Sequence, residues 1–536
     1  MVIIDNLYKW SRIPLKNYVV HYIGLTEELD PIVHYIDNTG EGLIRDELDK
    51  LLSKCMVAGS IIMESDKHII AIVDHFRCYP IFYTHLEGFI ISNSARKLCN
   101  LMGDKKRIKW NRDSLKEVEM SGYVTGSDTL IHGLKQFQSG ECLVVNKKSN
   151  SIDIRRYYRY TPKPICSKSD DEWIKELDVI MNRVTKRMID RANNGPIRIA
   201  LSAGLDSRIL ICKLHEFEYK NLESFSYGPK GSWEAKGAKR VAKRLSIPWK
   251  LITLSRKEAH NIFWGSERKK YFNFLDGLSS LSFSQEFFAF SKIKSNQLIP
   301  DDSIIINGQS GDFISGGHVP ESLLMKGANI ETLLNLIIKK HYSLQKDLLT
   351  EERLDFIKEK ILGLMGISDI NNELTSEDLI TLYEQWECEE RQVKWVINCQ
   401  RAQDFFGYDW QMPLWDIELA KFYSKVPIHL KINQNLYKLW LKKWNYKGLF
   451  VDFKPTVWKW PGYSIIIVFM AKPIGFFFGG KVKKSWYELF HYWGHDRDYY
   501  APYSYYYYFK VRKAIRNYVP LNIKTWIKEN KNLLKP

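Results

Sequence analysis

The sequence predicts a multidomain α/β protein, in which an antiparallel β-rich N-terminal domain precedes a doubly wound parallel sheet with a helical C-terminal part. Three observations support this fold class. The chain has 536 residues, which is too many for a single core. Short apolar runs with period-two alternation fill the first 160 residues. From about residue 170, continuously apolar strands alternate with helical segments.

We expect three regions along the chain. Residues 1–160 contain the runs SIIMESDKHIIAIVDH, IFYTHLEGFIIS and GECLVVNKKSNSIDIRRYY, whose alternation and turns indicate an antiparallel sheet. The stretch YTPKPICSKSDDE has the prolines and polar residues of a linker and leads into a second domain, residues 170–450. Residues 451–536 form an aromatic-rich extension to which the sequence assigns no chemistry.

The amino-acid composition limits the classes of protein to which this chain can belong. With 45% hydrophobic and 26% charged residues, extended disorder is excluded. The formal net charge of +17 suits an anionic partner such as a nucleotide, but general use of lysine at the surface is the preferred explanation. The basic residues form no discrete module, so we expect no nucleic-acid partner. Eight cysteines without CxxC spacing and a start without an apolar leader predict a reduced, cytoplasmic protein.

One apolar stretch, YSIIIVFMAKPIGFFFGG at residues 463–480, bears on membrane contact. Lys472 and Pro473 interrupt it after about eight apolar residues, well short of the roughly 20 that span a bilayer. Burial in a core is the main interpretation, and peripheral contact with a membrane interface is the alternative.

The second domain begins with the amphipathic segment DEWIKELDVIMNRVTKRMIDRAN, which predicts a helix. A strand over 197–201 follows, and a helix starts after Ser207. The strands LESFSY, WKLITL and SIIIN then alternate with helical segments such as WEAKGAKRVAKRL, as in a parallel sheet covered on both faces. Because ligands of such sheets bind outside the carboxyl ends of the strands, the motif LSAGLDSR marks a candidate site.

The residues of this motif suit a phosphate group. Backbone N–H groups at a helix N-terminus attract anions, Gly204 permits close approach, and two serines add hydroxyl donors. Asp206 can hold Mg²⁺, which in turn binds phosphate. The Walker pattern is absent because no GK[ST] follows. From the residues alone, a phosphate site and a plainly capped helix stay as alternatives.

LSAGLDSR resembles the SGGxDS loop of the asparagine synthetase family, whose members break ATP between the α- and β-phosphates. Later segments resemble the same family in order. They are SYGPKGSWEAKGAKRVAKRL, FLDGLSS, IIINGQSGDFISGG and QMPLWDIELAKFYSKVPIHLKINQNLYKLWLKK. The resemblance covers roughly residues 45–160 and 170–450. It implies an adenine nucleotide α-hydrolase-like sheet domain with ATP and Mg²⁺ as ligands.

The resemblance also implies roles for particular residues. Asp206 and Asp312 would share one Mg²⁺ that bridges the phosphates of ATP, and Lys438 would face the charge developing on adenylate and pyrophosphate. Gln309 and Asp276 fall on further catalytic positions. The residues expected at ATP are Ser202, Ala203, Gly204, Leu205, Asp206, Ser207, Tyr227, Gly228, Glu234 and Gly308. Simpler interpretations stay open, with Glu234 as a first-turn acid, Asp312 as a turn acid and Lys438 as a surface lysine.

The N-terminal segments AIVDHFRCYPIFYTHLEGFIIS and GYVTGSDTLIHGLKQFQSGECL resemble the family's glutaminase, an Ntn amidotransferase-like domain. That chemistry needs a cysteine at the start of the mature chain, whose thiolate attacks glutamine while the free α-amine acts as base. Residue 2 is Val2, and the nearest cysteine is Cys55. We therefore expect no glutaminase activity by this mechanism, and a domain that is a structural remnant or a reused surface.

Taken with its motifs, the resemblance implies an ATP-dependent, AMP-forming carbon–nitrogen ligase that adenylates a carboxylate and transfers ammonia or an amine to it. Three substrate types stay open: an asparagine synthetase-like pair using ammonia, a sugar acid, or a carboxylate and an amine of one molecule. β-Lactam synthetases and lasso-peptide cyclases are of the last type. The absent cysteine slightly favours the last two types. The sequence specifies neither the substrates nor the oligomeric state.

Two other functions compete with the ligase. A nucleotide-binding scaffold without catalysis is the main alternative, because four positions depart from the family pattern. They are Ala203, Arg208, Phe313 and Gln411. A tRNA-modifying ATP pyrophosphatase would account for the positive charge, but the chain lacks paired cysteines for sulfur transfer.

Overall fold

The computed structural model describes residues 1–24, 26–39, 45–55, 58–85, 88–102, 108–453 and 501–531, with isolated positions between 468 and 487. The expected membrane contact at 463–480 and much of the extension at 451–536 lie outside these described residues. Among the helices described, none has the length and apolar character needed to cross a bilayer. All eight cysteines fall within the described ranges, and no disulfide joins any of them.

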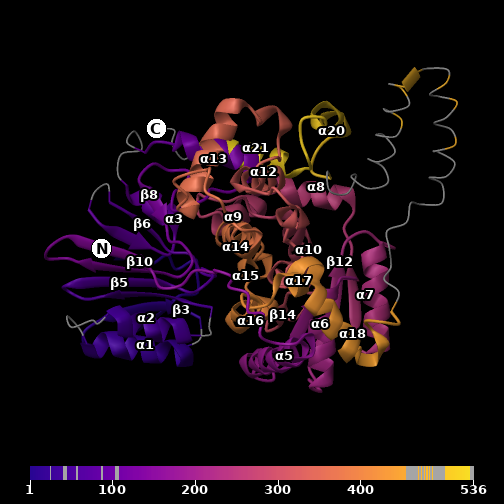
Figure 1. The fold of residues 1–536 in the computed structure, drawn as a ribbon, viewed down its shortest axis with the longest axis horizontal. Helices are drawn as coiled ribbons and strands as arrows, with labels where there is room; N and C mark the ends of the chain where they lie inside the picture. The colour runs from indigo at the N-terminus through magenta and orange to yellow at the C-terminus, as the bar shows by residue number, and fades with distance from the viewer. Residues whose placement is uncertain are drawn as a thin grey trace.

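Two sheets form the N-terminal part of the molecule (indigo to purple in Figure 1). Their strands are β1 Val2–Ile3, β2 Ser11–Pro14, β3 Val19–Ile23, β4 Ser60–Glu64, β5 His68–Val73, β6 Phe82–Thr84, β7 Ile90–Ser92, β8 Leu134–Gln136, β9 Glu141–Asn146 and β10 Ser151–Arg156. One sheet has the order β10-β9-β5-β4-β3-β2 and is antiparallel throughout. The other has the order β1-β7-β6-β8, with β1 and β7 parallel. The predicted antiparallel β-rich start is confirmed.

Alternation along the strands explains how this domain is layered. Ile61 and Met63 of β4 face helices α1 (Thr26–Thr39) and α2 (Arg45–Lys54), in one buried cluster. Ile62, between them, joins the cluster on the opposite face, which packs on the second sheet. Successive strand residues point to opposite faces, so a run that is apolar at every position can be buried on both sides.

A five-stranded parallel sheet forms the second domain. Its strands are β11 Ile197–Ala200, β12 Leu222–Tyr227, β13 Trp249–Ile252, β14 Ile304–Ile306 and β15 Asp409–Gln411. Their order is β13-β12-β11-β14-β15, and every neighbouring pair is parallel. The chain runs outward from β11 in both directions, so β11 and β14 lie at the switch point where ligands of such sheets bind. The predicted parallel sheet is confirmed.

Helices cover both faces of this sheet, as Figure 1 shows. One face carries α5 (Asp170–Ala192), α6 (Leu205–Glu216) and α7 (Trp233–Arg244), with α16 (Ile417–Tyr423) and α18 (Asn435–Trp444). The other carries α8 (Arg256–Trp264), α9 (Ser266–Leu275), α10 (Ser284–Ser295) and α15 (Ala402–Phe405). Ile306 points to the first face and Ile305 to the second, so the sheet is doubly wound.

The remaining helices connect and extend these layers. The α-helices are α3 Ala95–Leu101, α4 Arg112–Ser121, α11 Gly311–Ile314, α12 Ile330–His341, α13 Glu351–Met365, α14 Ser376–Trp386, α17 Ile428–Lys431, α20 Tyr505–Val511 and α21 Val519–Lys531. Short 3₁₀ turns are η2 Glu321–Leu324, η3 Lys346–Leu348, η5 Pro413–Trp415, η6 Ile432–Gln434 and η7 Tyr446–Gly448. Helix α14 continues directly into an 11-residue π-helix, η4, at Glu387–Ile397. π-Helices are rare and often mark functional sites.

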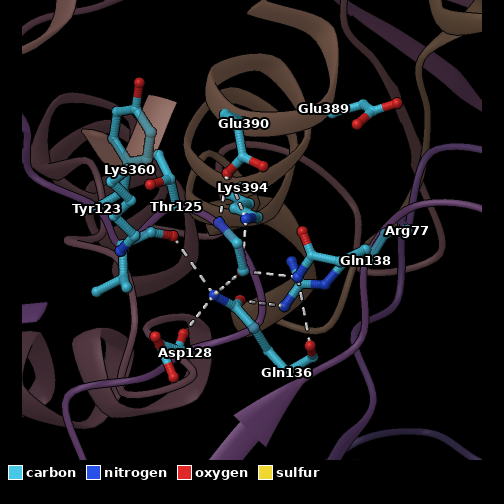
Figure 2. Close-up of polar contacts among 12 residues, drawn as sticks. Arg77, Tyr123, Thr125, Asp128, Gln136, Gln138, Lys360, Glu389, Glu390 and Lys394 are labelled. Carbon is cyan, nitrogen blue, oxygen red and sulfur yellow. Dashed lines mark hydrogen bonds and ion pairs between the residues drawn. The ribbon is translucent and has the colours of Figure 1, made fainter. Parts of the chain in front are cut away.

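The π-helix meets the N-terminal domain in a buried polar network (Figure 2). Lys394 forms an ion pair with Glu390 and donates to the carbonyl oxygen of Gly126 at 2.7 Å. Glu390 accepts from the Gly126 N–H at 2.9 Å. Gln136 donates to that carbonyl at 3.3 Å and accepts from Arg77 at 2.8 Å. The two domains are therefore joined by buried hydrogen bonds and an ion pair, and within the described residues Arg77 Nε is left without a hydrogen-bond partner.

Candidate active site

The loop between β11 and α6 is held in shape by its own hydroxyl groups. The Ser202 N–H donates to Ser207 Oγ at 3.0 Å, the two serine hydroxyls lie 3.1 Å apart, and the Gly204 N–H donates to Ser202 Oγ at 3.1 Å. Gly204 is the N-cap of α6 and supplies no side-chain acceptor, so the first-turn N–H groups from Leu205 onward are left for an anion. Ala203 does not adopt a positive φ, so its methyl group causes no backbone strain.

Arg208, which departs from the family pattern, stabilises this loop through hydrogen bonds to backbone carbonyl groups. Its guanidinium donates to the Ala203 carbonyl at 2.5 Å and to the Leu449 carbonyl at 3.0 Å. It also lies 4.5 Å from the centroid of the Phe453 ring, within the range of a cation–π contact. The substitution thus ties the loop to the segment that follows α18.

A second loop, after β14, comes into contact with the first. A Cβ atom at Gly308 would lie 2.8 Å from the backbone nitrogen of Ser207, and one at Gly311 would lie 2.6 Å from Cγ of Asp206. Both positions therefore need glycine for the close approach. The Asp312 N–H donates to the Asp206 carboxylate. The structure brings Asp206 and Asp312 to one point at the carboxyl end of the sheet.

Burial and the negative charge of Asp312 raise the pKa of Asp206 to about 7. The hydroxyl of Tyr437, on α18, donates to Asp206 at 3.0 Å and partly offsets this effect. Lys438 is the next residue of α18 and is exposed. The predicted lysine therefore lies next in sequence to the residue that contacts Asp206, at an exposed position of α18.

Asp312 has a partner that the sequence analysis did not include. Its Oδ2 lies 3.0 Å from Nε2 of His318, whose Nδ1 contacts the fully buried carboxylate of Glu387 in the π-helix. Burial lowers the pKa of His318, but hydrogen bonds to these two carboxylates outweigh it and raise the value to about 9. Lys340 also pairs with Glu387 at 2.8 Å. His318 is thus a cation held against one of the two candidate metal ligands.

The two aspartates fit the way in which Mg²⁺ is usually bound. Within the described residues, no three or more His, Cys, Asp or Glu side chains gather as a metal-binding group. Mg²⁺ commonly takes only one or two carboxylates and completes its shell with waters and substrate phosphates. Adjacent carboxylates, one with a raised pKa, favour a cation between them.

Gln309 lies in a buried polar group beside these loops. Its Nε2 donates to Glu286 Oε1 of α10 at 3.0 Å and to Gln400 Oε1 at 2.7 Å. Burial raises the pKa of Glu286 to about 7. The phenol of Tyr227, at the end of β12, lies close to Glu286 and lowers the pKa of this acid slightly against the effect of burial. The predicted residues Gln309 and Tyr227 are therefore joined by an acid that the sequence analysis missed.

Other predicted residues lie at the rim or elsewhere. Gly228 follows β12 with a φ of 138°, and a Cβ there would have no neighbour within 4 Å. Glu234 is exposed in the first turn of α7. This position fits the simpler interpretation, in which the acid interacts favourably with the helix dipole. Both positions flank the carboxyl end of β12.

Asp276 is placed in a different environment. Its fully buried carboxylate pairs with Arg96 of α3, accepts from Trp526 Nε1 of α21 at 2.7 Å, and accepts from the Leu278 N–H at 3.0 Å. These contacts join the N-terminal domain, α9 and the C-terminal helix. These contacts give Asp276 a structural role at this junction, and its catalytic role stays a prediction.

Three residues of the site were missed by the sequence analysis: Glu286, His318 and Tyr437. Glu286 is the one charged residue in the run FSQEFFAF, which is the local signal that could have drawn attention to it. His318 follows the Gly-Gly pair of the second loop, and Tyr437 immediately precedes the predicted lysine.

Comparison with known proteins gives one family. The model for asparagine synthase matches residues 177–449. No curated protein matches the chain. Among solved structures, glutamine phosphoribosylpyrophosphate amidotransferase from B. subtilis, complexed with ADP and GMP, aligns at a TM-score of 0.17 and 11% identity, covering 57% of this chain and 59% of that one. The structure of the allosteric regulatory enzyme of purine biosynthesis aligns at 0.19 and 10%, covering 55% of each chain.

The chain thus spans less than two thirds of the length of either solved structure. The family match is of a different kind, because it extends over more than half of the 536 residues and contains both loops of the candidate site. The chain belongs to the asparagine synthase family.

Proposed function

We propose that the protein adenylates a carboxylate with ATP, releases pyrophosphate, and transfers ammonia or an amine to the acyl adenylate with release of AMP. The observation that carries this proposal is the contact between the two loops. It sets Asp206 and Asp312 side by side above an uncapped helix N-terminus. A helix N-terminus binds phosphate, and paired carboxylates hold the accompanying cation.

Each part of the site has a distinct task in this reaction. Asp206 and Asp312 would hold Mg²⁺, which when bound neutralises charge on the phosphates. The loop N–H groups and the hydroxyls of Ser202 and Ser207 orient the triphosphate. Lys438 supplies a cation for the departing pyrophosphate. Glycines at the loop contact keep these groups within reach of one another.

We propose that the chain has no glutaminase activity of its own. Strands β1, β2 and β3 contain no cysteine, and Cys55 lies beyond them in the chain. The N-terminal domain then serves as support for the π-helix, which it contacts through Gly126. The nitrogen would come from free ammonia or from an amine on the substrate.

A nucleotide-binding scaffold without catalysis is the second candidate. One observation favours it, namely that His318 already occupies the Asp312 carboxylate and would compete with a metal ion. Under this function, ATP would bind but its α–β bond would stay intact.

ATP–pyrophosphate exchange in the presence of Mg²⁺ distinguishes the two functions. A panel of aspartate, uronic acids and carboxylate-bearing peptides serves as the acceptor. The ligase predicts exchange with at least one acceptor, and a loss of about 100-fold in Asp206→Asn. Asp301→Asn, at an exposed acid, is the matched control and should retain exchange. ATP binding without exchange for every acceptor would establish the scaffold and overturn the ligase.

A further inference from the structure

Glu286 is a buried acid for which the described residues provide no basic partner. Its Oε1 accepts from Gln309 at 3.0 Å and from Asn307 at 3.5 Å, and the phenol of Tyr227 lies close to the carboxylate. The titratable groups that face it are the phenols of Tyr227 and Tyr271, and burial raises the pKa of each well above its ordinary value. Both phenols therefore stay neutral, and the charge on the acid is not balanced by the protein.

Two acceptor atoms of this group have no donor. The Gln309 amide nitrogen donates to both Glu286 and Gln400, which fixes the orientation of the amide. Its Oε1 is consequently buried without a partner, and so is Oε2 of Glu286. Each buried, unpaired polar atom costs about 1–3 kcal/mol, and native proteins contain few of them. Two together, one of them carrying charge, are suited to a ligand with several donors and a positive charge.

The location of these atoms connects them to the proposed reaction. Gln309 follows Gly308, whose backbone contacts Ser207 of the phosphate loop, and precedes Asp312 by three residues. The unpaired acceptors therefore belong to the loop that contacts the adenylation site. Gln309 itself cannot act as a base because its amide has no accessible protonation near neutral pH.

We propose that Glu286 and Gln309 bind the nitrogen nucleophile, an ammonium ion or a primary ammonium group, and that Glu286 is the base that deprotonates it. This inference rests on the proposed function and names the substrate that completes it. The charged carboxylate provides the counter-ion, and Gln309 Oε1 accepts a second N–H.

The step balances as follows. Glu286 takes one proton from the ammonium group, and the nitrogen lone pair attacks the acyl carbon of the adenylate. A carbon–nitrogen bond forms, the bond from the acyl carbon to the phosphate oxygen breaks, and AMP leaves with the bonding electron pair. The second proton passes from nitrogen to the AMP phosphate. Glu286 then returns its proton to solvent.

Separate assays of the two half-reactions test this role. Adenylation is followed by ATP–pyrophosphate exchange, which needs no nucleophile, and transfer is followed by amide or hydroxamate formation from ammonium chloride or hydroxylamine. Glu286→Gln should retain exchange and lose transfer by about 100-fold or more, the usual scale of general-base catalysis. Glu286→Asp should recover part of the transfer rate. Gln285→Ala, at the exposed neighbour on α10, is the matched control.

The possible failures are distinguishable. Transfer that is unchanged in Glu286→Gln, or exchange and transfer that fall by the same factor, would overturn the role of Glu286 while leaving the ligase intact. An equal fall in exchange and transfer would assign Glu286 to folding or to ATP binding. If the wild-type protein shows no exchange with any carboxylate, both the ligase function and the role of Glu286 as a base are overturned.

Discussion

At the scale of single residues, buried acids decide what the candidate site can hold. Asp206 and Glu286 both have a pKa raised to about 7, chiefly by burial, but their surroundings differ. Asp206 faces a second carboxylate, which suits a divalent cation. Glu286 faces amides and a phenol, which suits a hydrogen-bonding cation such as ammonium. The two acids thus divide the site into a metal side and an amine side.

The raised pKa of Glu286 predicts a pH-dependent stability. Its ordinary pKa is 4.5 and its folded value is about 7, so the folded state binds the proton more tightly. The tighter proton binding contributes about 3 kcal/mol to the free energy of unfolding. This contribution is fully present below about pH 4.5 and is lost as the pH rises to about 7. Glu286→Gln removes the titration. Between pH 4.5 and 8, its free energy of unfolding should therefore rise by about 3 kcal/mol relative to wild type.

Urea unfolding of both proteins at the two pH values measures this difference. Glu267→Gln, which removes an acid from the first turn of α9, serves as the control and should show no comparable change. An equal stability difference between wild type and Glu286→Gln at both pH values would contradict the prediction.

The sequence allowed us to predict the residues of the two loops, but not the side chains that contact them. Asp206, Asp312 and Gln309 were found because each falls in a short motif that follows a strand. Glu286 and His318 act through contacts with residues distant in the chain, Gln309 and Glu387 respectively, and a linear pattern does not record such contacts. Asp276 matched a motif, yet its contacts with Arg96 and Trp526 place it in a junction.

At the scale of elements, the π-helix Glu387–Ile397 connects the halves of the molecule. Its acids are buried, and each has a cation from another part of the structure or from the next turn. Glu387 pairs with Lys340, and Glu389 with Arg156 and Arg159. Burying carboxylates in this way is favourable only when every partner is in place.

Removing the buried ammonium of Lys394 should destabilise this element strongly. Lys394 and Glu390 are 1% and 4% exposed, and burial lowers the pKa of the lysine to about 8. Lys394→Met leaves the carboxylate uncompensated and should cost about 3–5 kcal/mol in denaturant unfolding. The double variant Lys394→Met/Glu390→Gln should recover a large part of the loss.

Lys116→Met on α4 is the comparison for Lys394→Met, since Lys116 is partly exposed, pairs with two exposed acids, and should change stability by less than about 1 kcal/mol. A Lys394→Met protein as stable as this control would show that the pair contributes nothing. A double variant no more stable than the single one would show that Glu390 is not the source of the cost.

Regular elements were predictable and the π-helix was not. The apolar period of two predicted the N-terminal strands, and the alternation of strands with helical segments predicted β11, β12, β13 and β14. A π-helix differs from an α-helix in its hydrogen-bond step, and 11 residues such as ECEERQVKWVI carry no pattern that separates the two. Its acidic residues would suggest a solvated face, but partners more than 200 residues away bury Glu389 and Glu390.

At the scale of the whole molecule, a continuous set of contacts runs from the N-terminal domain to the candidate metal ligands. Arg156, at the end of β10, and Arg159 hold Glu389. Two residues earlier in the π-helix, Glu387 contacts His318, which lies 3.0 Å from Asp312. A domain that resembles a glutaminase thereby orients a residue of the synthetase site.

Loosening this contact should change ATP binding without a substitution in the site itself. The double variant Arg156→Met/Arg159→Met leaves Glu389 buried without its cations, so the π-helix should shift and His318 should lose its fixed position. We expect the ATP concentration at half-maximal pyrophosphate exchange to change by about 3- to 10-fold, which corresponds to a coupling of about 1 kcal/mol or slightly more. Arg155→Met is the matched control, because Arg155 lies in the same strand but pairs with Asp49 and Asp153 inside the N-terminal domain. Equal ATP dependence in the double variant and in this control would mean that the N-terminal domain does not influence the site through the π-helix.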